Sequence, residues 1–78
     1  MLAMQRYQSA NQNTGVIAYQ IMPDEIIIKF RDGSVYLYTT ASTGKQHINQ
    51  MQNLAKKGEG LTTYINQHVR ENYHQKLS

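Results

Sequence analysis

The stretch EIIIKFRDGSVYLY, residues 25–38, decides the fold of this chain. Two runs of β-branched and aromatic residues flank Asp32-Gly33, and each run has the two-residue period of a strand. Asp-Gly between such runs is typical of a two-residue hairpin turn, because a type I′ turn needs positive φ at both central positions. If Arg31 pairs with Ser34, Phe30 faces Val35. The same register predicts that Ile28 faces Leu37 and that Ile26 faces Thr39.

A second turn is predicted at Pro23-Asp24, because proline cannot donate to a sheet ladder. Pairing Met22 with Glu25 places Ile21 opposite Ile26, and the two turns then agree on one apolar face of a three-stranded sheet. The residues predicted for that core face are Ile17, Tyr19, Ile21, Ile26, Ile28, Phe30, Val35 and Leu37.

After Thr39 the apolar residues recur at helical spacing. Ser42 or Thr43 is the predicted N-cap of a first helix, and Gly58 is its predicted C-terminal stop. The apolar stripe of this helix consists of Ala41, Ile48, Met51, Leu54 and Ala55. A second helix is predicted from about Leu61 to Tyr73, with a buried stripe of Leu61, Tyr64, Ile65, His68 and Asn72.

The predicted fold class is therefore α+β. It is a three-stranded antiparallel β-meander followed by two α-helices packed on one face, in the order β-β-β-α-α. Residues 1–14 are predicted to be a flexible N-terminal arm, because they are rich in Gln, Asn and Ser. Residues 15–73 form the single domain, and residues 74–78 are predicted to be a frayed tail.

Composition limits the classes of function. The 78 residues suffice for one domain, and the absence of cysteine excludes disulfides and thiolate metal sites. No apolar run exceeds four residues, far short of a membrane span, and residues 1–14 lack the apolar region of a signal peptide. We therefore expect a cytoplasmic protein without a membrane partner. The net charge of +3 is compatible with an anionic partner, although it is far from a dense basic patch.

The ionisable residues do not form a recognisable catalytic set. Five carboxylates and three histidines are present, and no pair of carboxylates has the spacing that acid–base chemistry needs. His68 and His74 are six positions apart, whereas metal ligands on a helix require a spacing of three or four. We expect neither an enzyme nor a metal site nor a cofactor, and His68 is interpreted as a histidine within the core.

The predicted register leaves one face of the sheet open, and that face is unusually rich in tyrosine. Its candidate interaction residues are Lys29, Arg31, Tyr36, Tyr38 and Ile27. Tyrosine and arginine are frequent at protein interfaces, and aromatic rings interleaved with basic residues also bind single-stranded nucleic acid. The same composition is compatible with strand propensity alone, with cover by the N-terminal arm, and with burial in a homodimer.

A third candidate lies where the sheet leads into the first helix. Ser42, Thr43, Gly44 and Lys45 combine two hydroxyls, a cation and the free N–H groups of a helix start. Such a group can hold a phosphate or another small anion. An ordinary polar helix cap accounts for the same residues.

The hairpin FRDGSVYLY, residues 30–38, resembles the Phe-x-x-Gly-x-x-Tyr-x-Tyr hairpin of KTSC domains. Ile17-Ala18-Tyr19 is similar to the first strand of that family. Leu54-Ala55, Gly58 and Tyr64-Ile65-Asn66 are similar to its Ala-x-Ser-x-Gly-x-x-aromatic-Asn segment. KTSC domains occur at the C-terminus of some lysyl-tRNA synthetases and as small free-standing proteins. The resemblance covers residues 16–66 and implies no catalytic residues, and the synthetase association points to RNA.

These observations predict a small non-enzymatic interaction module. Its first expected partner is a protein or a second copy of the chain, bound through the tyrosine-rich sheet face. RNA or single-stranded DNA on the same face is the second expectation. A small anion at residues 42–45 is the third.

Overall fold

The computed structural model describes residues 4–8 and 15–78, and in this part of the chain five strands form one antiparallel sheet in the order β1-β2-β3-β4-β5. The elements are β1 Gln5–Arg6, β2 Val16–Met22, β3 Glu25–Phe30, β4 Val35–Thr39, α1 Thr40–Thr43, α2 Lys45–Lys57, α3 Leu61–Tyr64, the π-helical turn η1 Ile65–Val69, and β5 Gln75–Lys76. The α+β class and the antiparallel meander are thus confirmed, with β1 and β5 added at the two edges.

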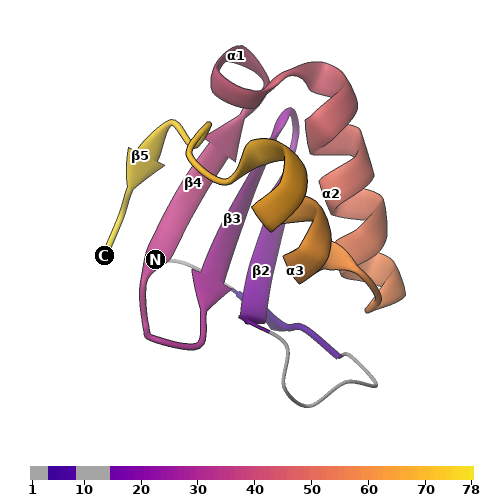
Figure 1. Ribbon diagram of the computed structural model, residues 1–78, viewed down its shortest axis with the longest axis vertical. Helices are drawn as coiled ribbons and strands as arrows, with labels where there is room; N and C mark the ends of the chain where they lie inside the picture. Colours follow the sequence, from indigo (N-terminus) through magenta and orange to yellow (C-terminus); the bar gives the residue numbers. More distant parts are fainter. Residues whose placement is uncertain (1–3, 9–14) are drawn as a thin grey trace.

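The helices α2 and α3 lie across the same face of the sheet (Figure 1). The core fills the space between these two layers. Its buried side chains are Tyr7, Val16, Tyr19, Ile26, Ile28, Tyr38, Ile48, Met51, Ala55, Leu61, Ile65 and Val69. Among the described residues no helix is long and apolar enough to cross a membrane.

The β2–β3 hairpin has the predicted register over most of its length. Met22 pairs with Glu25, and Ile21 pairs with Ile26. Asp24 has a φ of 61°, which suits the third position of a turn whose second position is a proline. The prediction is wrong only at the far end, where a register shift between Val16 and Ala18 places Val16 opposite Phe30.

The β3–β4 hairpin differs from its predicted register by one residue. Lys29, and not Phe30, pairs with Val35. The backbone N–H of Phe30 donates to Ser34 O at 2.9 Å, so the loop has three residues, and Gly33 takes a φ of 92°. This is a three-residue hairpin with glycine at the left-handed position. Asp32 supports it, because its Oδ1 accepts from Ser34 N at 2.9 Å and from Ser34 Oγ at 2.6 Å.

The shift by one residue reverses the two faces of β4. Tyr36 now pairs with Ile28 and Tyr38 with Ile26, so both tyrosines lie on the helix-covered face. Val35 and Leu37, predicted to lie in the core between sheet and helices, lie on the opposite face with Ile27. The prediction that the tyrosines lie on the open face is therefore wrong.

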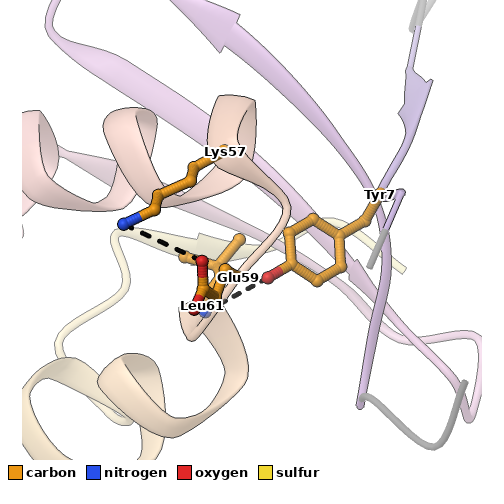
Figure 2. Close-up of polar contacts among 4 residues, drawn as sticks. All are labelled: Tyr7, Lys57, Glu59 and Leu61. Atoms are coloured by element: carbon orange, nitrogen blue, oxygen red, sulfur yellow. Dashed lines mark hydrogen bonds and ion pairs between the residues drawn. The ribbon is translucent and has the colours of Figure 1, made fainter. Parts of the chain in front are cut away.

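Part of the predicted flexible arm is an ordered edge of the sheet. Gln5 pairs with Tyr19 and Arg6 with Ala18, while Tyr7 is 5% exposed. The Tyr7 hydroxyl accepts a hydrogen bond from Leu61 N at 3.2 Å (Figure 2). This bond satisfies one of the free N–H groups at the start of α3. The remaining arm residues, 1–3 and 9–14, lie outside the described residues.

The ends of the helices also differ from the prediction. Thr39, and not Ser42 or Thr43, caps the first turn, α1, in a reciprocal capping box with Ser42. The predicted first helix is divided at Gly44, and Gly58 ends α2 in the left-handed conformation, as predicted.

The predicted second helix ends early. It is regular only over α3 and closes in the π-helical turn η1, which stops at Val69. The segment that follows does not fray, because β5 pairs with β4. Its bonds include His74 N to Leu37 O at 2.7 Å and Leu77 N to Val35 O at 2.7 Å.

Candidate functional site

A hollow of about 350 Å³ lies where β4, the β3–β4 loop and η1 meet. We call it the tyrosine pocket. It is lined by Phe30, Asp32, Ser34, Tyr36, Tyr38, Ile65, Asn66, Arg70, Glu71 and Tyr73. Its volume falls within the roughly 300–1,000 Å³ of ordinary ligand pockets.

Four aromatic rings in contact form one wall of the tyrosine pocket. The rings of Phe30 and Tyr36 meet edge to face, with centroids 5.6 Å apart. Tyr73 lies 4.6 Å from Tyr36 and 6.3 Å from Tyr38 between centroids. Tyr38 is 1% exposed and Tyr73 is 37% exposed, so the wall extends from the core to the surface.

The ring of Tyr73 is positioned by contacts outside regular secondary structure. Its neighbour Asn72 receives a hydrogen bond at its backbone O from Thr43 Oγ1 at 2.7 Å. The hydroxyl of Tyr38 donates to the backbone O of Arg70, at a longer 3.4 Å. These two bonds tie the chain after η1 to α1 and β4. The π-helical turn lies directly before this segment, and such turns are frequent at functional sites.

Charges surround the aromatic wall. The lining includes two carboxylates, Asp32 and Glu71, and the guanidinium of Arg70. Hydrogen bonds from Ser34 lower the pKa of Asp32, so this side chain is a carboxylate at neutral pH. The ammonium of Lys76 lies over the Tyr36 ring, 5.9 Å from its centroid.

Burial controls the acidity of the deepest ring. Desolvation raises the pKa of Tyr38 to about 12, and the neighbouring Tyr36 and Tyr73 contribute to the increase. Tyr38 is therefore a neutral phenol over the whole physiological range, and it acts as a hydrogen-bond donor and an apolar surface.

The predicted interaction face is divided in this structure. Tyr36 and Tyr38 come together in the tyrosine pocket, whereas Lys29 and Ile27 lie on the opposite face of the sheet. Arg31 is exposed in the β3–β4 loop. The cause is the one-residue difference between the predicted and the observed register of this hairpin. Sequence reasoning missed the other eight lining residues of the tyrosine pocket. Three of them, Arg70, Glu71 and Tyr73, reach β4 only through the folded segment after η1.

The hydroxyls of the predicted anion site already have protein partners. Ser42 Oγ donates to Thr39 O at 3.2 Å, and Thr43 Oγ1 donates to Asn72 O. Gly44 N donates to Thr40 O at 2.9 Å. Lys45 is the first residue of α2. The four predicted residues are adjacent. Ser42 takes part in a helix cap, which agrees with the alternative interpretation of these residues as a polar cap, and Thr43 binds the distant Asn72.

The histidine predicted to lie in the core is instead on the surface. His68 is exposed, while Val69 beside it is 1% exposed. Its ring stacks 6.0 Å from that of His47, whose Nδ1 lies 2.6 Å from the Tyr64 hydroxyl. Within residues 4–8 and 15–78, no group of three or more His, Cys, Asp or Glu side chains could hold a metal ion.

Known proteins provide no further guide to this site. Comparisons of the chain with family models, with curated proteins and with solved structures find no match.

Proposed function

We propose that this protein is a non-enzymatic interaction module that binds a protein partner at the tyrosine pocket. The observation that carries the proposal is the wall of four contacting rings, open to solvent at Tyr73 and bordered by charged side chains. Tyrosine and arginine are enriched where partners anchor in protein interfaces, and a concave aromatic site is suited to one inserted side chain.

The rigidity of the site supports binding. Tyr36 pairs with both β3 and β5, and Tyr38 pairs with β3. Only Tyr73 lies on an irregular segment, and its ring packs against both others. A partner would therefore meet a preformed surface, which lowers the entropic cost of association.

The chemistry of the rim separates a protein partner from a nucleic acid. Asp32 and Glu71 both line the hollow, and each would repel a phosphate that approached the rings. Arg70 would attract it. Lys76 over Tyr36 would attract it as well. Both carboxylates line the hollow itself and Lys76 does not, so we place RNA or single-stranded DNA second. The KTSC resemblance, with its association with RNA, stays a prediction.

The test is selection of peptides from a random displayed library, with affinities then measured by calorimetry. Peptides selected on the wild-type protein should lose at least ten-fold in affinity for Tyr73→Ala. Leu77→Ala is the matched control, because Leu77 is also 37% exposed on the same C-terminal segment and does not line the pocket.

Two results would overturn the proposal. One is a set of peptides whose binding does not change in Tyr73→Ala. The other is failure to select any peptide while a mixed single-stranded RNA pool binds with an affinity that falls steeply as salt rises. Sedimentation equilibrium of the same samples identifies a second copy of the chain as the partner, since that complex needs no added ligand.

A further inference from the structure

We propose that the side chain accepted by the tyrosine pocket is cationic: a lysine, an arginine or a methylated ammonium of the partner. This inference rests on the proposed function and specifies the chemistry of the ligand. It depends on the faces of the rings, on the charges of the lining residues, and on a cation that the chain itself places at the site.

The rings supply the first argument. An ammonium or guanidinium within about 6 Å of a tyrosine centroid is attracted by the negative face of the ring. The pocket offers Tyr36, Tyr38 and Tyr73 together with Phe30. The tilt of 47° between Tyr36 and Tyr73 and the angle of 87° between Tyr38 and Tyr73 turn these rings toward different directions. Because Tyr38 is 1% exposed, we infer that a cation entering the hollow meets Tyr36 and Tyr73.

The charges of the lining residues supply the second argument. Asp32 and Glu71 contribute two negative charges and Arg70 one positive charge to the lining. Lys76, over Tyr36, balances the remaining negative charge, so the lining is net negative once Lys76 leaves the ring. The Asp32 carboxylate is kept ionised by its bonds to Ser34. A cationic side chain would balance this charge, whereas a carboxylate or phosphate would add to it.

Lys76 supplies the third argument. Its ammonium already lies 5.9 Å from the centroid of Tyr36, on the strand that pairs with this residue. The side chain of Lys76 is exposed, so it can leave the ring at little cost. The register of β4 and β5 thus brings a cation to the Tyr36 ring, and an external cation would have to displace Lys76 from it.

The experiment uses choline and its uncharged isostere 3,3-dimethyl-1-butanol as probes, titrated into the full chain and followed by NMR. The two probes have nearly the same shape, so any difference reports the charge. We expect choline to shift the ring signals of Tyr36 and Tyr73 and to bind about ten-fold more tightly than the alcohol.

Variants locate the site and test the competitor. Lys76→Met should strengthen choline binding by about three-fold and leave binding of the alcohol unchanged. Lys29→Met is the matched control, because Lys29 lies on the opposite face of the sheet, and it should change neither affinity. Asp32→Asn combined with Glu71→Gln should weaken choline binding without moving the affinity for the alcohol.

The possible outcomes separate the cationic chemistry of the ligand from the proposed protein partner. Equal affinities for the two probes would overturn the cationic chemistry, while peptides that depend on Tyr73 would still support the proposed function. Ring shifts with phosphate but not with choline would overturn it as well. Failure of the peptide selection, with choline bound as expected, would instead reject the protein partner and leave a site for a small organic cation.

Discussion

The two hairpins that share β3 look alike in sequence, yet only one has the register that its turn residues predict. In the β2–β3 hairpin, Pro23-Asp24 forms a two-residue turn, and Ile21 pairs with Ile26 as expected. In the β3–β4 hairpin, Asp32-Gly33 belongs to a three-residue loop, and Ile26 pairs with Tyr38 in place of Thr39. The loops of the two hairpins differ in length by one residue.

The difference shows that the turn type also determines which side chains of the next strand face the core. Side chains alternate along a strand, so one extra loop residue moves every side chain of the next strand to the other face. In β2 and β3 the pattern of apolar residues indicates which face of the sheet is buried. In β4, the sequence VYLYT places large apolar or aromatic side chains on both faces, so the pattern accepts either register. The site depends on this choice, because only the observed register places Tyr36 and Tyr38 beside Tyr73.

The largest expected effect comes from replacing a β4 residue on the helix-covered face. Tyr38→Ala should lower the free energy of unfolding by about 3–5 kcal/mol, as for other large buried aromatic residues. Leu37→Ala, on the opposite face and half-buried, should cost about 1 kcal/mol. Urea denaturation of both variants measures the difference. The reverse order of the two costs would mean that β4 has the two-residue register after all.

The second prediction tests the burial of the Tyr38 ring through the pH dependence of the free energy of unfolding. Because folding raises the pKa of Tyr38 to about 12, the folded state holds the phenolic proton more tightly than the unfolded state. This contribution is complete below pH 10 and is lost as pH rises from 10 through 12. Two pKa units correspond to about 3 kcal/mol.

Unfolding of wild type and Tyr38→Phe, compared across this pH window, measures that contribution. The other tyrosines are the same in both proteins, so the comparison isolates Tyr38. If the two proteins lose stability to the same extent as pH rises, the Tyr38 ring is not buried. The proposed difference between the registers of the two hairpins would then be wrong.

The third prediction, with a smaller expected change in the free energy of unfolding, tests the three-residue β3–β4 loop. Gly33 has a φ of 92°, and a Cβ added there would meet no heavy atom within 4 Å. Gly33→Ala should therefore destabilise through backbone strain alone, by about 1–2 kcal/mol. Thermal unfolding measures it. A neutral substitution would show that Gly33 can adopt a negative φ in solution and that the loop is not the one described.

The smallest expected change in the free energy of unfolding comes from the positive-φ residue of the β2–β3 turn. Asp24 has a φ of 61°, so Asp24→Gly removes left-handed strain while it adds freedom to the unfolded chain. These two effects nearly cancel, and we expect a change within about 0.5 kcal/mol in the free energy of unfolding, again measured by thermal unfolding. A loss above about 1 kcal/mol would mean that the Asp24 side chain, and not only its backbone, stabilises the β2–β3 turn.

Several features of the fold follow from local sequence. The turn at Pro23-Asp24 and the apolar residues on either side suffice for the β2–β3 register. The spacing of Ile48, Met51 and Ala55 predicts the buried stripe of α2, and all three are at most 2% exposed. Gly58 ends α2 because only glycine adopts the left-handed conformation there at low cost. Each feature depends on residues close together in the chain.

The candidate site could not be predicted in this way. Its wall joins Tyr36 and Tyr38 to Tyr73, more than thirty positions later in the sequence. The segment that carries Tyr73 is held by the bonds of Tyr38 to Arg70, Thr43 to Asn72 and His74 to Leu37. The edge strands β1 and β5 have two residues each, too short for a detectable period. They form because β2 and β4 offer unpaired backbone groups to them.

The sequence by itself therefore determined the α+β class, the meander, the β2–β3 register and the end of α2. Only the tertiary structure decided which face of β4 is buried and where the rings converge. The physical reason is that both faces of β4 are apolar enough to enter a core, so packing against the helical layer, and not the pattern of β4, selects Tyr38 over Leu37 for burial.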